Sequence, residues 1–328
     1  MTAAAPGAGG APVWSPPASS PQEEDTGRYL LDRGGLLGPL MLLPAVVYIF
    51  GLVGVPLVIA VLYSLSDVTV ADQSIDWVGL ENFRAVIRNG TFRTALGNSI
   101  VLALVSQVIV LILANVLVLV LSQSFPGKRL VRFLILLPWT TPIALAAVGW
   151  LWLLDNIYSP IDAALRSLNL LGPGTTFGPG RNMLWLSKDD LAQLSVLTIH
   201  VWRTLPLATV ILLAGLTAIP QDVKDAADVD GAGFWRQLVY IRLPLLSPIM
   251  AVAALYGIVF TFTDMTVVYV LTGGGPVDST QVLASWAYYK GIGGSDLAQG
   301  AAIALFLFPV LVGIAVLMLR LARRTETT

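Results

Sequence analysis

The sequence of 328 residues contains no cysteine and only one histidine, His200. The absence of cysteine excludes disulfides, thiolate metal sites and cysteine nucleophiles, and a single histidine excludes a multi-histidine metal site. Charged residues are also scarce, at 12% of the chain, whereas soluble domains carry about a quarter. The net charge of −1 gives no sign of nucleic-acid binding. We therefore expect no metal site, and a surface that mostly does not face water.

Apolar residues dominate the composition of the sequence. Hydrophobic types make up 56% of the sequence, and the mean hydropathy is +0.78. A helix that crosses a bilayer needs about 20 predominantly apolar residues. The sequence predicts an all-α integral membrane protein with six transmembrane helices, at about residues 36–64, 98–121, 133–154, 194–219, 245–271 and 298–319.

The segment before the first predicted helix differs in composition. Residues 1–33 are rich in Ala, Pro, Gly and Ser, and such a segment buries too little apolar area to fold by itself. We expect a disordered cytoplasmic tail there and no signal peptide. The rest divides into a first transmembrane helix with its outer loop (34–97), a core of five transmembrane helices (98–322) and a cytoplasmic C-terminal end (323–328).

Basic residues predict the orientation in the membrane. The short turn between the second and third predicted helices carries Lys128, Arg129 and Arg132 and no acidic residue. The C-terminal end is also basic, with Arg320 and Arg323. Lys and Arg are enriched in cytoplasmic loops, so we expect both termini of a multi-pass protein to lie in the cytoplasm of a prokaryotic cell, at the plasma membrane.

The loop between the fourth and fifth predicted helices, residues 220–244, has a distinctive pattern. Pro220 starts a helix whose early acidic residues, Asp222 and Asp225, complement the positive end of the helix dipole. Small side chains follow, and we expect Gly231 to end this helix before a second, amphipathic one. Taken alone, the segment is also typical of an amphipathic helix that lies on the bilayer surface.

The whole loop resembles the EAA loop of permease subunits in binding-protein-dependent ABC importers. That loop has Glu-Ala-Ala, three residues and glycine, followed further on by Leu-Pro; this chain has Ala226, Ala227, Gly231 and Leu243-Pro244 in that order, and it departs at the first position, where it has aspartate. The resemblance implies that the loop forms a coupling helix that seats in an ATPase subunit. The residues that it assigns to this contact are Asp225, Ala226, Ala227, Asp230 and Gly231.

Four further segments resemble the sugar-importer branch of the same family, in the same order along the chain. They begin at Trp77, Leu137, Trp202 and Leu271, and the resemblance covers about residues 36–322. Within this branch the chain is most similar to the MalF and UgpA type of subunit and, among these, to SugA-type trehalose permeases. The resemblance implies a type I ABC importer fold with a MetI-like core.

The resemblance also implies the partners of the chain. Family members pair with a second, homologous permease, bind two copies of an ATPase subunit and receive sugar from an extracytoplasmic binding protein. Transport then proceeds by alternating access. The chain has no Gly-x-x-x-x-Gly-Lys-Ser/Thr phosphate loop, so we expect it to be no enzyme and to bind no cofactor, with ATP and Mg²⁺ used by the ATPase subunits.

Ionisable residues inside membrane helices are expensive and usually functional. Arg203 and Asp264 are two such residues, and the rise per residue lets them share a depth. In related sugar permeases the corresponding faces of the fourth and fifth helices line the central cavity. The candidate substrate pathway comprises His200, Arg203, Leu207, Gly257, Thr261 and Asp264, with Trp150 and Trp202 as candidate stacking residues.

Several alternatives stay open at this point. Arg203 and Asp264 also suit a purely structural ion pair, His200 suits the membrane interface, and the two tryptophans suit packing. The partner permease is an alternative source of the main sugar contacts. The transported molecule is trehalose, a maltose-type oligosaccharide or glycerol 3-phosphate. An ion-coupled secondary transporter is a further class, although we find no sign of its inverted repeats.

Overall fold

The structure is a computed structural model that describes residue 2 and residues 37–326. The expected tail over residues 1–33 lies outside the described residues. By its internal contacts the chain divides into two units, residues 1–55 and 56–328. The domain boundaries expected from the sequence stay a prediction.

In the first unit the structure describes α1 (Leu37–Ile49) and a π-helical turn (Phe50–Gly54). Their side chains are apolar and almost all exposed within this chain. A helix that is apolar on every side belongs in lipid or against another membrane helix. The helical run Gly38–Ser64, which ends with α2 (Val55–Ser64), has 27 residues and is long enough to cross a bilayer.

Among the described residues, five helical runs are long and apolar enough to cross a membrane. Besides Gly38–Ser64 they are α4 (Gly90–Ser122), α8 (Asp189–Ala218), the run Phe234–Thr263 and α14 (Leu297–Glu326). The run Phe234–Thr263 consists of α10 (Phe234–Gln237), a π-helical turn and α11 (Leu243–Thr263). Together these results establish a multi-pass, helical membrane protein.

The third predicted helix is not one straight element. It is divided into α5 (Lys128–Thr140) and α6 (Ile143–Leu153), which meet at a bend of 98°. The cause lies at Thr141, which has extended backbone (φ −77°, ψ 133°) and directly precedes Pro142. Proline disfavours helical geometry in the residue before it. The chain therefore has six spans only if this bent pair counts as one, and the six-span count stays a prediction.

The fifth predicted helix, 245–271, also ends earlier than expected. Helix α11 stops at Thr263, and a separate short helix, α12 (Thr266–Leu271), follows. At its other end the helical run begins at Phe234, well before the predicted start at about residue 245. Pro244 lies inside this run, just after the π-helical turn Leu238–Arg242, and local π-helical adjustments are one way in which membrane helices accommodate proline.

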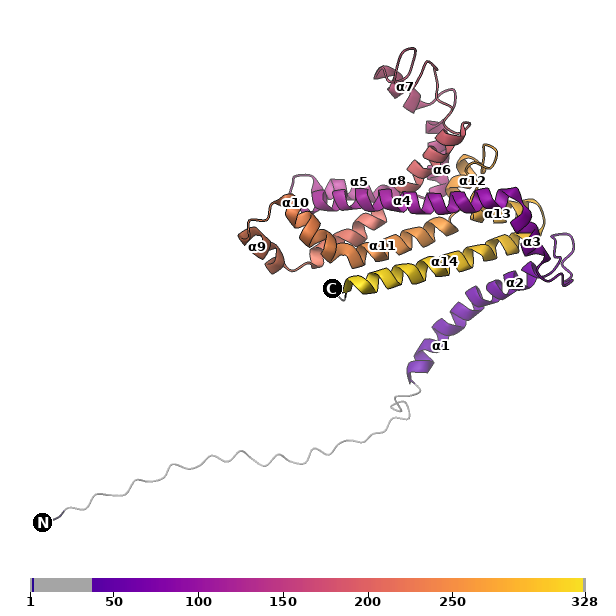
Figure 1. The fold of residues 1–328 in the computed structure, drawn as a ribbon, viewed down its shortest axis with the longest axis horizontal. Coiled ribbons are helices and arrows are strands. Elements are labelled where there is room, and N and C mark those ends of the chain that lie inside the picture. Colours follow the sequence, from indigo (N-terminus) through magenta and orange to yellow (C-terminus); the bar gives the residue numbers. More distant parts are fainter. Residues whose placement is uncertain (1, 3–36, 327–328) are drawn as a thin grey trace. The chain divides into compact units, whose positions relative to one another are not determined.

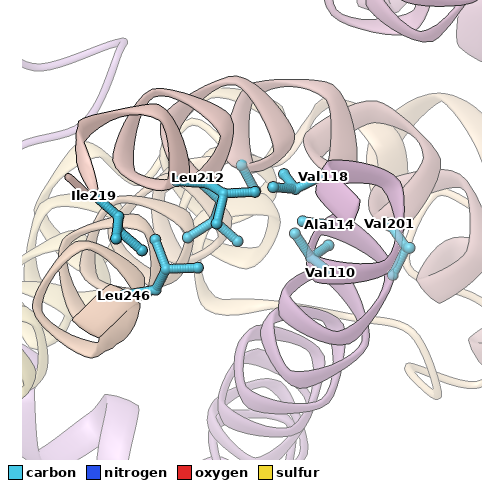
Figure 2. Packing of buried hydrophobic residues seen from close by; sticks show 9 residues of the cluster. Val110, Ala114, Val118, Val201, Leu212, Ile219 and Leu246 are labelled. Carbon is cyan, nitrogen blue, oxygen red and sulfur yellow. The ribbon is translucent and has the colours of Figure 1, made fainter. Parts of the chain in front are cut away.

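The central core joins α4, α8 and α11. Val110, Ala114 and Val118 repeat every four residues on α4 and face Leu212 of α8 and Leu246 of α11, as Figure 2 shows. Four-residue spacing places side chains on one face of a helix. The shared apolar face fixes α8 against α11, which is the helix pair that carries the candidate site.

Shorter helices occupy the connections between these runs (Figure 1). They are α3 (Glu81–Arg88), α7 (Pro160–Ser167), α9 (Gln221–Val229) and α13 (Leu283–Tyr288). A second core cluster joins α3, α4, α13 and α14 through Val86, Phe92, Leu283 and Ile303. The described residues are helical or irregular, apart from a single bridge between Ser66 and Trp77.

Candidate functional site

A buried polar contact joins α8 to α11 near the C-terminal end of α11. The Nε2 atom of His200 lies 2.8 Å from the hydroxyl oxygen of Thr261, and both residues are buried. The Thr261 hydroxyl donates its only proton to the carbonyl of Gly257 at 2.7 Å. His200 must therefore donate through Nε2, which fixes its tautomer. This burial argues against a position for His200 at the membrane interface.

One turn further along α8, an ion pair joins the same two segments. Arg203 donates from Nη1 to Oδ2 of Asp264 at 2.8 Å, with side-chain exposures of 15% and 10%. The expectation that these residues share a depth is thus confirmed. A charge-assisted hydrogen bond of this length is among the stronger protein contacts. The guanidinium also lies 4.8 Å from the ring centroid of Phe260, within cation–π range.

Asp264 lies at a break in the helical backbone. It caps the C-terminal end of α11 in extended conformation, and its Oδ1 accepts a hydrogen bond from the backbone N–H of Thr266 at 3.2 Å. Non-helical backbone at membrane depth is tolerated where it is buried in protein or lines a cavity. Broken helices of this kind often provide the ligand sites of transporters.

The cavity beside this cluster is small in the conformation described. It has a volume of about 10 Å³ and is lined by Gln107 of α4, Leu207 of α8 and Gly257 of α11, among others. That volume corresponds to about one water molecule. A molecule the size of a sugar therefore does not fit in this cavity in the conformation described.

Gly257 leaves room for the side chain of Gln107, which comes from α4. A Cβ atom at this position would overlap the side-chain amide of Gln107. The same amide donates to the carbonyl of Ala253 at 3.5 Å. Gln107 was not among the residues predicted from the sequence. An amide in the middle of a long apolar helix was the available signal, because a buried amide needs a partner.

The two candidate stacking residues contact each other. The rings of Trp150 and Trp202 meet edge to face, with centroids 5.5 Å apart. Both are half-buried, and Trp150 packs against the cluster that includes Ile199 and Val268. This geometry favours packing over a free platform for a sugar ring.

The loop after α8 forms a helix with a well-defined end. Helix α9 stops at Val229, and Gly231 has a positive φ of +67°. The N–H of Ala232 donates to the carbonyl of Ala227, and the N–H of Gly231 donates to that of Asp228. This pair of hydrogen bonds is the Schellman motif, in which the left-handed position favours glycine. Gly231 is therefore required by the turn itself.

The side chains of α9 point in different directions. Ala226 is exposed, whereas Ala227 is buried, so the two alanines do not form one exposed ridge. Asp225 accepts a hydrogen bond from Gln221 at 2.8 Å, and Asp230 is exposed. Figure 1 shows α9 beyond the ends of α5 and α11, where its exposed face can meet another protein.

Gln237 ties α9 to the run that contains α11. Its amide donates to Oδ1 of Asp228 at 2.6 Å and to the carbonyl of Ala232 at 2.9 Å, while its oxygen accepts from Arg242 at 3.2 Å. The angle between α9 and α10 is therefore held by one side chain. Gln237 was not among the residues predicted from the sequence, because its partners depend on the turn at Gly231.

Comparison with known proteins gives a family. Residues 117–327 match the model of the family described as binding-protein-dependent transport system inner membrane component. The matched region includes the polar cluster on α8 and α11 as well as the loop with Gly231.

Two relatives align over most of the chain. The trehalose/maltose transport system permease protein MalF of Thermococcus litoralis is 30% identical over 293 residues, which cover 89% of this chain and 95% of the relative. The sn-glycerol-3-phosphate transport system permease protein UgpA of Yersinia pestis is 30% identical over 266 residues, covering 81% and 86%.

A solved structure shares the fold. A chain from a bacterial ABC transporter involved in the import of the acidic polysaccharide alginate superposes with a TM-score of 0.75. The match covers 90% of this chain and 97% of that chain, at 18% sequence identity. The likeness at this identity concerns the fold alone.

Proposed function

The chain belongs to the family of inner membrane components of binding-protein-dependent transport systems, and from this premise we propose that it is the permease subunit of an ABC importer for a carbohydrate. It forms a passage for solute and is not an enzyme, because ATP hydrolysis belongs to a separate ATPase. The relatives described above carry the same assignment as permease proteins.

The buried polar cluster on α8 and α11 is the observation that supports a sugar. His200, Thr261, Arg203 and Asp264 bring hydrogen-bond donors and acceptors into membrane helices, beside a break in the backbone. Sugar hydroxyls need both kinds of partner. We assign the substrate pathway to this cluster together with Leu207, Gly257, Trp150 and Trp202.

The charge balance of the cluster favours a neutral sugar over glycerol 3-phosphate. A phosphate ester needs a cation that is free to receive it, but Arg203 is already engaged by Asp264. Among neutral substrates, the disaccharide trehalose is the first candidate, because the MalF relative is named for trehalose and maltose. A maltose-type oligosaccharide is the alternative.

The coupling contact is assigned to α9. Its exposed side chains and fixed C-terminal turn suit a helix that seats in a groove of an ATPase subunit, with Asp225, Ala226, Ala227, Asp230 and Gly231 as the contact residues. We propose two ATPase copies that use ATP and Mg²⁺, a second, homologous permease, and an extracytoplasmic binding protein that delivers the sugar. This chain binds no cofactor of its own.

The basic residues support the orientation. Lys128 and Arg129 lie at the end of the molecule where α4 passes into α5, and α9 lies at this same end (Figure 1). We place this end, with both termini, in the cytoplasm. The bent pair α5 and α6 then counts as one span of six in the plasma membrane.

Uptake measurements test the proposal. Cells that lack this chain, with and without re-supplied protein, receive labelled trehalose, maltose or glycerol 3-phosphate. We expect trehalose uptake to be lost and then restored, with the other two unchanged. Selective loss of maltose or glycerol 3-phosphate uptake would support the assignment as an importer but would identify that compound, and not trehalose, as the substrate. Unchanged uptake of all three would remove the support for a carbohydrate of this set.

A further inference from the structure

A second cavity lies at the end of the molecule that carries α9. Its volume is about 280 Å³, near the lower limit of ligand pockets in proteins. It is formed where the ends of α4 and α8 meet the beginnings of α5 and α9. Four basic side chains from three segments line it, and no acidic residue does: Lys128, Arg132, Lys224 and Arg242.

These cations have no counter-ion within the described part of the chain. The ion pair formed by Arg203 and Asp264 is elsewhere, and no side chain of the four takes part in another. On α9, Asp225 accepts a hydrogen bond from Gln221 and Asp228 accepts one from Gln237, and neither carboxylate forms an ion pair with a cation that lines the cavity. Lys128, Lys224 and Arg242 are half-buried, which weakens the screening of their charges by water.

The helix ends around the cavity do not balance this charge. The C-terminal ends of α4 and α8 each contribute about half a negative charge, and the N-terminal ends of α5 and α9 contribute about half a positive charge each. These four contributions cancel. The four basic side chains thus concentrate positive charge around a small volume.

The rest of the lining suits a headgroup at a membrane surface. Leu121, Leu213 and Leu216 form an apolar side, whereas Gln123 adds a polar amide. Exposed apolar residues continue along α5 at Leu130, Phe133 and Leu134. Basic pockets between membrane helices on the cytoplasmic side are suited to anionic lipid headgroups.

We propose that this cavity binds a phosphate group, held by Lys128 and Arg132 of α5 together with Lys224 of α9 and Arg242. The apolar side and the continuous apolar surface of α5 favour the phosphate of an anionic phospholipid, and a soluble phosphate shares the same chemistry. A bound phosphate joins α5 to α9 and thereby stiffens the loop that follows α8. The inference is independent of the transported substrate.

A lipid-binding measurement tests this site. The full chain is placed in phosphatidylcholine nanodiscs that contain a small fraction of spin-labelled phosphatidylglycerol, and the immobilised fraction of the label is recorded. Arg132→Gln should weaken binding about fivefold, as expected when one of the cations that line the cavity is removed from an anionic headgroup. The double variant Lys128→Gln/Arg132→Gln should weaken it about 25-fold by the same reasoning.

Arg129→Gln is the matched control, because it removes the same charge from the same turn of α5 but Arg129 does not line this cavity. It should change binding less than twofold, and Arg132→Lys should retain binding. Radiolabelled inorganic phosphate, applied to the chain in pure phosphatidylcholine, separates the two sources. Binding of inorganic phosphate that depends on Arg132 would identify the ligand of this cavity as a soluble phosphate.

Two results would overturn the proposal. The first is that Arg132→Gln and Arg129→Gln change the binding of both probes equally, or that neither variant changes it. The other is unchanged binding of both probes by the double variant, combined with a weaker affinity for the ATPase subunit, which would assign the four cations to protein docking.

Discussion

The Arg203–Asp264 pair is the contact on which the proposed substrate pathway depends most directly. Arg203→Ala leaves Asp264 without its partner in a largely buried position. Removing one member of a buried pair destabilises a protein by about 3–5 kcal/mol. We expect Arg203→Ala to lower both the unfolding temperature of the purified protein and its sugar uptake.

The double variant Arg203→Ala/Asp264→Ala separates structure from transport. Without either charge, the unfolding temperature should recover, because no lone ion remains buried. If the pair lies in the substrate pathway, uptake should stay low in the recovered protein. Recovery of uptake together with stability would assign the pair a purely structural role.

The contact between Gly257 and Gln107 gives a second prediction at this scale. Gly257→Ala places a methyl group where the amide of Gln107 lies, and overpacking of this kind costs about 1–3 kcal/mol. We expect a lower unfolding temperature for Gly257→Ala and partial recovery when Gln107→Ser is added. As a control, Gly149→Ala should have little effect, since its position is open. Equal effects of both alanines would contradict this explanation.

Part of the candidate site could be predicted from the sequence because the geometry of a single helix is regular. The rise per residue places Arg203 and Asp264 at one depth, and helical spacing places His200 on the face of Arg203. The partner of His200 depends on how α8 crosses α11. The spacing of residues along a single helix does not predict that crossing. Gln107 was missed for the same reason, because it comes from a third helix.

At the scale of the element, the turn after α9 determines where the loop points. Gly231→Glu forces a side chain into the left-handed region, where non-glycine residues cost about 1–2 kcal/mol. We expect the protein to remain in the membrane but sugar uptake to be uncoupled from ATP hydrolysis, as measured with both assays on reconstituted transporter.

Two controls accompany this variant. Gly233→Glu adds the same charge at a residue with ordinary φ (−65°), and Gly231→Asn keeps a residue that tolerates the left-handed region. Both should retain more coupling than Gly231→Glu. Equal uncoupling by Gly233→Glu would show that added charge, and not the turn, is responsible.

The bend between α5 and α6 shows the limit of hydropathy at this scale. Residues 133–154 are apolar enough for one span, but their average hydropathy does not indicate whether the helix is straight or bent. The bend follows from Thr141 and Pro142, a local effect of two residues that hydropathy does not contain. The same applies to the break at Asp264, where the side chain bonds the following backbone and ends the helix.

At the scale of the whole molecule, the number of membrane crossings can be measured. The absence of cysteine lets single cysteines be introduced without background labelling. We expect Arg129→Cys to react with an impermeant thiol reagent only from the cytoplasmic side, and Asn169→Cys only from the outer side. That result would make α5 and α6 one span. Labelling of both from the same side would reduce the count to five.

One continuous helical run joins the loop after Gly233 to the break at Asp264. The 30 residues from Phe234 to Thr263 span about 45 Å at 1.5 Å per residue. Such a rod acts as a lever. A tilt of about 5° about its Phe234 end displaces the other end by about 4 Å over this length, which exceeds the 2.8 Å between Nη1 of Arg203 and Oδ2 of Asp264. A small tilt of the whole run is therefore large enough to separate the ion pair, without a hinge inside the run.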